Sequence, residues 1–202
     1  MNIGIDIDDT ISNSFESVFV ESQKFDIEEL GNKGKVKEYG KIADHYFIET
    51  LYSHWTEEQT NMFWSKYFIN MLTKATPKTY VSETFEKIKQ DGNNIILITA
   101  RHEVEGSGIS IEDYTKKWLE KNNIKYDKLV MNAQDKLIYA QENNIDIFID
   151  DSIKHCKRML EGNIKPLIFT SISNQGVEVP EIERVYSWPQ AYEIIKQESK
   201  KM

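Results

Sequence analysis

The chain opens with the stretch Ile3-Gly4-Ile5-Asp6-Ile7-Asp8-Asp9-Thr10, a short apolar run that ends among acidic residues. Isoleucine-rich runs of this length are typical of strands buried in a parallel sheet. Successive side chains of an extended chain point to opposite sides, so Asp6 and Asp8 share one side and Ile7 takes the other. Open parallel sheets bind ligands at the carboxyl ends of their strands. We therefore expect Asp6 and Asp8 to lie at a binding site.

The second half of the chain alternates between apolar runs and segments with helical periodicity. The predicted strands are 95–98, 128–131, 147–149 and 166–169, and the predicted helices are 80–90, 110–122, 132–143, 152–160 and 188–197. Strands and helices that alternate through short connections form right-handed βαβ units. The predicted fold class is therefore α/β, with a Rossmann-like parallel sheet that includes the first strand.

Residues 11–76 interrupt this alternation and carry no strand signal of similar quality. Helical signals lie at 14–25, 42–51 and 56–72, and glycine-containing loops are predicted at 31–40 and 106–108. The third helix begins with Thr56-Glu57-Glu58-Gln59, which has the spacing of a capping box. We predict a core domain formed by 1–10 and 77–202, and a small helical cap domain formed by 11–76.

Polar side chains follow the carboxyl ends of further predicted strands, and a lysine lies near the start of a neighbouring helix. These residues are Thr99, Ala100, Arg101, Lys136, Asp150 and Asp151. With Asp6 and Asp8, the site would hold four carboxylates and one lysine, a formal charge of −3. Such a density of like charges requires a bound cation, and an all-oxygen ligand set favours Mg²⁺. Beside a bound phosphoryl group, one carboxylate can act as nucleophile and a second as general acid and base.

The motifs Asp6-x-Asp8-x-Thr10, Thr99, Lys136 and Asp150-Asp151 resemble, in this order, the four motifs of the haloacid dehalogenase superfamily. The resemblance covers residues 1–10 and about 77–190. It implies that Asp6 is the nucleophile and Asp8 the general acid/base, as in the phosphatase branch.

The same resemblance implies how the remaining motif residues act. Thr99, Ala100 and Lys136 would bind the phosphate. Asp6, the main-chain carbonyl of Asp8, Asp150 and Asp151 would bind Mg²⁺.

The insertion after the first motif is similar to a C1-type cap, and the whole is most like the 5'-nucleotidase and 5'(3')-deoxyribonucleotidase group. This implies a Mg²⁺-dependent phosphomonoesterase that acts on (deoxy)nucleoside monophosphates through an aspartyl-phosphate. One alternative is a phosphatase for another small phosphate ester, such as a sugar phosphate. A different class of protein, the receiver-type phospho-acceptor signalling module, also combines an aspartate cluster with threonine, lysine and Mg²⁺.

Composition limits the partners. The 202 residues carry a net charge of −8 and have a mean hydropathy of −0.55. This acidity disfavours nucleic acid and anionic membranes, which leaves a small phosphorylated metabolite as the expected partner and a homodimer as an open question. The chain has a single cysteine, Cys156, and shows no signal-peptide pattern and no membrane-spanning stretch, so we expect a cytoplasmic protein.

Arg101 and the aromatic residues of the insertion each allow two interpretations. Arg101 could contact the leaving group of the substrate or form a surface ion pair. The aromatic residues of the insertion could stack on a ligand, but most are expected to fill the core of the cap. Those aromatic residues are Tyr46, Phe47, Tyr52, Trp55, Phe63, Trp64, Tyr67 and Phe68.

Overall fold

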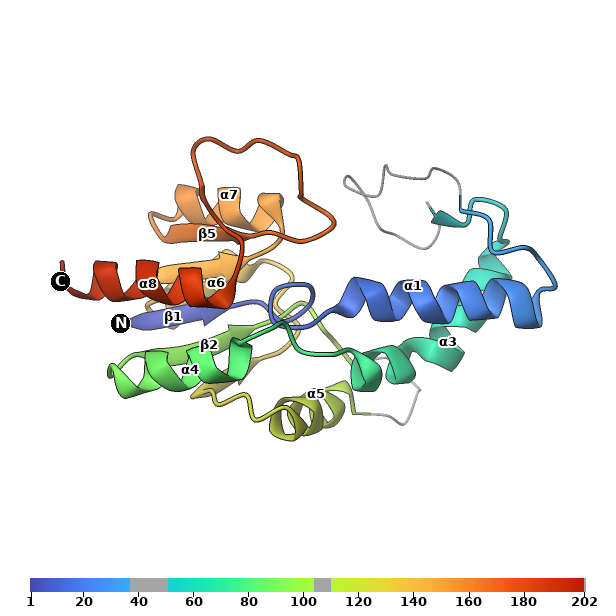
Figure 1. Ribbon diagram of the computed structural model, residues 1–202, viewed down its shortest axis with the longest axis horizontal. Helices are drawn as coiled ribbons and strands as arrows, with labels where there is room; N and C mark the ends of the chain where they lie inside the picture. The colour runs from blue at the N-terminus through green and yellow to red at the C-terminus, as the bar shows by residue number, and fades with distance from the viewer. Residues whose placement is uncertain (37–50, 104–109, 202) are drawn as a thin grey trace.

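The computed structural model describes residues 1–36, 51–103 and 110–201 (Figure 1). The predicted helix 42–51 lies outside these ranges except for its last residue. The predicted loop 106–108, and the part of the loop 31–40 beyond residue 36, also lie outside them, as do Tyr46 and Phe47.

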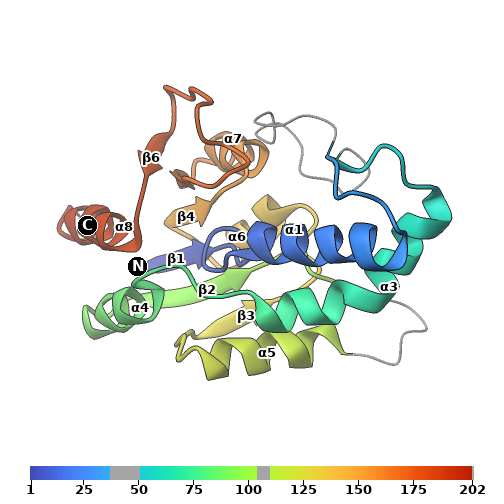
Figure 2. The same ribbon diagram turned by 45° about the vertical axis from the view of Figure 1, so that its right-hand side comes forward.

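A six-stranded parallel sheet forms the centre of the molecule (Figures 1 and 2). Its strands are β1 (Asn2–Ile5), β2 (Asn94–Ile98), β3 (Lys128–Val130), β4 (Ile147–Asp150), β5 (Lys165–Phe169) and β6 (Glu183–Val185). They are arranged in the order β3-β2-β1-β4-β5-β6, which is the order of doubly wound nucleotide-binding folds. The predicted α/β class with a Rossmann-like sheet is confirmed.

The register of the sheet aligns the carboxyl ends of its central strands. Ile5 of β1 pairs with Leu97 of β2 on one side and with Ile149 of β4 on the other. Directly before Ile5, a Cβ on Gly4 would lie 2.5 Å from the Phe148 ring, so glycine is needed for the two strands to pack. The sequence after each of these strands therefore begins at the same level of the sheet edge.

Helices cover both faces of the sheet. They are α4 (Val81–Gln90), α5 (Ile111–Lys121), α6 (Lys136–Glu142), α7 (Ile153–Glu161) and α8 (Trp188–Ser199). Side chains of α4, α5 and α8 pack on one face in the largest hydrophobic cluster, which includes Phe85, Trp118 and Trp188. On the other face, side chains of α6 and α7 form a second cluster around Phe148. Apart from the first residue of β1, β2 and β5, every residue of the four strands β1, β2, β4 and β5 is thus buried, as the apolar runs predict, whereas the edge strands β3 and β6 are mostly exposed or half-buried.

Several element ends differ from the prediction. The helix expected to start at Asn132 starts at Lys136, because Asn132 has a left-handed φ of 56° and Asp135 caps the helix through its side chain. Helix α7 ends at Glu161, one residue beyond the predicted end, and the left-handed residue that follows it is Asn163, with a φ of 58°. Strand β6 was not predicted, since a three-residue strand with one buried side chain leaves little periodicity to detect.

The segment between β1 and α4 is helical and extends away from the sheet (Figure 1). It contains α1 (Ser14–Lys24), the π-helix η1 (Phe25–Glu29) and α3 (Glu57–Lys74). The capping box is confirmed: the Gln59 backbone N–H donates to the Thr56 hydroxyl, and the Gln59 side chain accepts from the Thr56 N–H. The buried members of a separate hydrophobic cluster lie in this segment, with rings of Phe25, Trp55 and Phe63 in mutual contact. The boundaries of the cap at 11 and 76 stay a prediction.

The two chain crossings between this segment and the sheet run side by side. The Asn13 N–H donates to the Thr76 carbonyl at 2.8 Å, and the Lys78 N–H donates to the Ile11 carbonyl at the same distance. The described residues contain no helix that is long and apolar enough to cross a membrane.

Candidate active site

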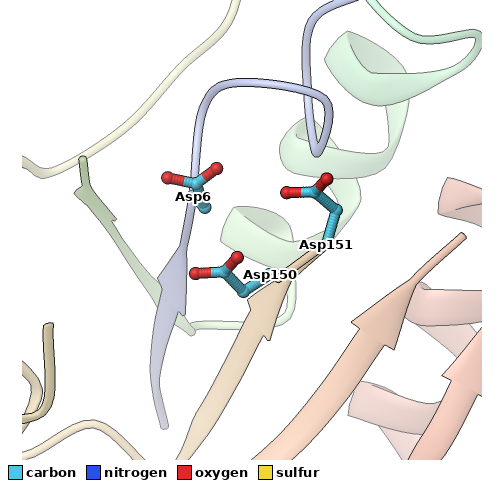
Figure 3. A group of neighbouring side chains, drawn as sticks. All are labelled: Asp6, Asp150 and Asp151. Atoms are coloured by element: carbon cyan, nitrogen blue, oxygen red, sulfur yellow. The ribbon is translucent and has the colours of Figure 1, made fainter. Parts of the chain in front are cut away.

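Three aspartates converge where β1 and β4 end side by side (Figure 3). Asp6 follows the last residue of β1, Asp150 ends β4, and Asp151 comes directly after it. All three are buried, and one carboxylate oxygen from each lies within 4.8 Å of the other two. This is the point at which the strand order reverses direction across the sheet, where ligands of doubly wound folds bind.

Lys136, the first residue of α6, joins two of these carboxylates. Its Nζ lies 2.5 Å from Asp6 Oδ1 and 2.8 Å from Asp150 Oδ2, and its side chain is only 3% exposed. A cation at a helix N-terminus opposes the helix dipole, so this position is unfavourable unless anions compensate it. The carboxylates of Asp150 and Asp6 do so, and they raise the pKa of Lys136 above its ordinary value although burial lowers it.

The single lysine does not neutralise the three carboxylates. Burial, together with the charges of Asp150 and Asp8, raises the pKa of Asp6 to about 6 despite Lys136. Burial and the neighbouring carboxylates raise the pKa of Asp151 well above its ordinary value. Burial also acts on Asp150, but Lys136 and His155 outweigh it and lower the Asp150 pKa to about 2. The site therefore holds more negative charge than its own cation balances.

These three carboxylates fit a hard divalent cation. They offer buried oxygen donors from two adjacent strands, at mutual distances that one ion can span. Burial and the neighbouring carboxylates raise the pKa of Asp6 and of Asp151, so their ionised forms would be stabilised by a bound cation. Mg²⁺ prefers oxygen ligands of this kind, few in number and supplemented by water or phosphate. Asp8 directs its side chain elsewhere, and the contribution of its main-chain carbonyl stays a prediction.

Asp8 is held by Arg101 from the segment after β2. Arg101 Nε donates to Asp8 Oδ2 at 2.9 Å and Nη2 donates to Asp8 Oδ1 at 2.6 Å. Ser14 Oγ also donates to Oδ1, at 2.6 Å. Burial raises the pKa of Asp8, but Arg101 and Ser14 outweigh it and the pKa is lowered.

Arg101 thus adds a second cation to the site, and its own side chain is only 4% exposed, whereas that of Asp8 is 36% exposed. Four carboxylates with Lys136 and Arg101 leave a formal charge of −2 (−4 + 2), not the −3 expected when only the lysine is counted.

The predicted phosphate ligands border the same edge. Thr99 is buried after β2, and its hydroxyl accepts from the Arg101 N–H at 3.2 Å. Ala100 is partly exposed next to it. Thr10 links the two central strands: its hydroxyl lies 3.4 Å from Asp6 Oδ2 and accepts from the Asp151 N–H at 3.1 Å. Their roles toward a phosphate stay predictions.

Sequence reasoning missed the residues that support Asp151. Ser171 and Ser173 donate to Asp151 Oδ2 at 2.9 and 3.0 Å, and Asn174 Nδ2 donates to the Asp151 carbonyl. All three follow the carboxyl end of β5, so the rule that identified the polar residues after the other strands would have identified these as well. His155 of α7 contacts Asp150 Oδ2 at 3.1 Å.

A cavity of about 150 Å³ opens beside Asp8 and Arg101, between the sheet edge and helices α1 and α3. Its polar wall is formed by Asp8, Asp9, Ser14 and Arg101, and its apolar wall by Phe15, Val18, Trp64, Phe68, Met71 and Leu72. Two of the aromatic residues singled out in the sequence, Trp64 and Phe68, therefore reach the site. The others of that set in the described residues are Tyr52, Trp55, Phe63 and Tyr67, which pack in the cluster between the helices of the insertion.

Known structures share this architecture. A haloacid dehalogenase superfamily hydrolase from Geobacter sulfurreducens superposes with a TM-score of 0.68 at 11% identity, and covers 96% of this chain and 95% of its own. The chain has the haloacid dehalogenase fold. A haloacid dehalogenase-like hydrolase from Streptococcus pneumoniae (TM-score 0.66, 12% identity, 96% and 97% covered) and a β-phosphoglucomutase from Clostridium difficile (0.64, 13%, 99% and 97%) have it too.

Sequence relatives of similar length also exist. A Bacillus cereus protein named "Putative nucleotidase" is 27% identical over 98% of this chain and 100% of its own length. The Bacillus subtilis "Putative nucleotidase YqfW" is 25% identical over 95% and 91%. No family model matches the chain. Within the haloacid dehalogenase fold, Asp6, Asp8, Thr99, Lys136 and Asp150-Asp151 lie at the strand and helix ends where the resemblance expects them.

Proposed function

We propose that this chain is a Mg²⁺-dependent phosphomonoesterase that forms an aspartyl-phosphate on Asp6. The observation that carries the proposal is the arrangement of Asp6 and Asp8. The two carboxylates of one short motif are paired with different cations, Lys136 and Arg101, and so occupy different electrostatic environments. Two carboxylates with separate surroundings can take separate roles. Asp6 lies among the candidate metal ligands, where a bound cation would keep it ionised, and Asp8 lies at the mouth of the cavity, where it can exchange a proton with the leaving oxygen.

In the first half of the reaction, an Asp6 oxygen attacks phosphorus and the bond to the leaving oxygen breaks. Asp8 gives a proton to that oxygen. Because Asp8 is ionised in the resting site, it takes this proton from the bound ester, a fraction of which is monoprotonated near neutral pH since the second pKa of a phosphate ester is about 6. Lys136 stabilises the charge on the transferred group.

In the second half, Asp8 accepts a proton from a water molecule that attacks the phosphorus. The bond between phosphorus and Asp6 breaks, and inorganic phosphate and the free Asp6 carboxylate are released. A bound Mg²⁺, held by Asp6, Asp150 and Asp151, would supply positive charge to the phosphoryl oxygens in both halves.

We further propose a (deoxy)nucleoside monophosphate as substrate. The names of the Bacillus relatives support this, as does the cavity beside Asp8, whose aromatic wall suits a planar ring. The core domain 1–10 and 77–202 would hold the phosphate, and the cap domain 11–76 would contact the leaving group.

The receiver alternative lacks support, because receivers of the CheY type order their strands 2-1-3-4-5, whereas β1 here lies between β2 and β4.

Phosphate release from a panel of nucleotides and sugar phosphates, with Mg²⁺, tests the proposal. We expect nucleoside monophosphates to be hydrolysed by the wild type and no turnover by Asp6→Asn. A preference for sugar phosphates over every nucleotide would overturn the substrate but keep the mechanism. Full activity of a folded Asp6→Asn variant would overturn the mechanism.

A further inference from the structure

We infer that Arg101 is the positioning residue of the acid/base step and not a ligand of the substrate. The inference rests on the proposed function, because it assigns Asp8 the proton transfers. Two of the three guanidinium nitrogens, Nε and Nη2, donate to separate oxygens of Asp8. The third, Nη1, donates to Thr115 Oγ1 at 3.1 Å. Each nitrogen is thus bonded to the protein before any substrate arrives.

The guanidinium group is itself fixed from two sides. Thr115 lies on α5, is fully buried, and fixes the Nη1 end. At the other end of the residue, the Arg101 N–H donates to Thr99 Oγ1, and the Arg101 carbonyl accepts from the Asn132 N–H at 2.7 Å. Because the side chain is 4% exposed, it has little room to turn toward a ligand. The Arg101 guanidinium group is therefore held in place by the protein and binds both oxygens of the Asp8 carboxylate.

Asp8 needs such a support because its own surroundings are loose. Its side chain is 36% exposed at the mouth of the cavity, and apart from Arg101 its carboxylate has one hydrogen-bond partner among the described residues, the Ser14 hydroxyl. A planar fork that bonds both carboxylate oxygens fixes the plane of the carboxylate as well as its distance, whereas a hydroxyl on one oxygen leaves rotation free. Loss of the fork would let Asp8 turn away from the leaving oxygen and from the attacking water.

The expected loss depends on the leaving group. A positioned general acid contributes about 10²–10⁴-fold to a rate, and a misplacement of about 1 Å can cost about 10²-fold. A nitrophenolate leaves readily without a proton, whereas an alkoxide does not. A residue that acts through Asp8 should therefore matter for alkyl phosphates much more than for aryl phosphates. A residue that binds the phosphate or supports the fold should affect both substrates equally.

The experiment compares kcat/KM for p-nitrophenyl phosphate with that for the alkyl phosphate of the panel that the wild type hydrolyses fastest. The value of kcat/KM depends only on the steps up to formation of the phosphoenzyme. We expect Arg101→Ala to lower kcat/KM for the alkyl ester by about 10²-fold and for the aryl ester by less than about tenfold. A burst of nitrophenolate followed by slow turnover is expected as well, because Asp8 must also activate water. Arg101→Lys, which keeps the charge but not the fork, should lose nearly as much as Arg101→Ala.

Two further variants complete the test. Thr115→Val removes the hydroxyl that anchors Nη1 at nearly constant volume, and should reproduce a weaker form of the same leaving-group dependence. Arg158→Ala removes an exposed arginine of α7, paired with Glu161 and Asp135, and should leave both rates unchanged. Thermal melting verifies that each variant is folded.

Equal loss on alkyl and aryl esters in folded Arg101→Ala, or full activity of Arg101→Lys on the alkyl ester, would overturn the positioning role while the phosphatase proposal stands. Absence of phosphate release from every ester by the wild type would instead overturn the phosphatase proposal.

Discussion

Replacement of the nucleophile by its amide, Asp6→Asn, should make the metal-free protein more stable while it abolishes turnover. The carboxylate of Asp6 is buried among like charges, and the neutral amide has nearly the same shape. Burial raises the pKa of Asp6 from 3.8 to about 6. Each pKa unit corresponds to about 1.4 kcal/mol, so the ionised form costs the fold about 3 kcal/mol at neutral pH.

The direction in which stability changes with pH follows from proton binding. Between pH 3.8 and about 6 the native state holds a proton on Asp6 that the unfolded state has released, so the stability of the wild type falls as pH rises through this window. Above pH 6 the full cost of about 3 kcal/mol is present, and at pH 5 about half of it. The Asp6→Asn variant lacks this titrating carboxylate, so its stability does not fall in this pH window.

Thermal melting in EDTA measures the difference. In a chain of this size, 1 kcal/mol shifts Tm by about 2–4 °C, so Asp6→Asn should melt roughly 6–12 °C above the wild type at pH 7.5. The gap should narrow at pH 5 and close below pH 4. Asp113→Asn, an exposed carboxylate in the first turn of α5, serves as the matched control and should not gain stability. An Asp6→Asn variant that melts at or below the wild-type Tm at pH 7.5 would refute the electrostatic account of the site.

Three other perturbations test separate parts of the structure. Lys136→Met removes the buried partner of Asp6 and Asp150 and should destabilise the metal-free protein by about 3–5 kcal/mol in denaturant titrations. Its control, Lys116→Met on the surface of α5, should change the stability by less than about 0.5 kcal/mol. Equal effects of the two substitutions would contradict the bridging role of Lys136. Asp26→Ala leaves the buried Trp55 Nε1 without its acceptor, along with three other donors, and should cost about 1–3 kcal/mol. Burial raises the pKa of Asp26, but these hydrogen bonds outweigh it and lower the pKa, so this stability should persist above about pH 4 and be lost only in stronger acid; loss near neutral pH would contradict it. Chelation by EDTA should stop phosphate release, and added Mg²⁺ should restore it; undiminished turnover in EDTA would exclude the proposed cation.

The sheet and the position of the site were predictable because they depend on local patterns. Each central strand is a short apolar run that ends at a polar residue, and parallel pairing brings those ends together whatever the detailed packing. Asp6, Thr99 and Asp150 are placed by this rule alone. Lys136 was predictable because a lysine at a helix start needs an anion nearby.

What the sequence did not show depends on contacts between distant segments. The pairing of Arg101 with Asp8 joins residues 93 positions apart, and no periodicity links them. Asp9 presents a similar case: its Oδ1 accepts from the Phe15 N–H at the start of α1, and its backbone is left-handed, with a φ of 57°. The π-helix η1 was also missed, since a single wide turn continues the periodicity of α1 with one residue's offset.

The central claim is that Asp6 carries the phosphoryl group, and trapping it on Asp8→Asn tests this most directly. That variant keeps the nucleophile but lacks the base that activates water. With p-nitrophenyl phosphate, whose leaving group needs no general acid, the phosphoenzyme should therefore accumulate. Mass spectrometry of acid-quenched protein should find one phosphoryl group on the N-terminal peptide that contains Asp6, and none in the Asp6→Asn, Asp8→Asn double variant. The account would be contradicted if the wild type releases phosphate but Asp8→Asn carries no phosphoryl group on Asp6, or carries it on another residue.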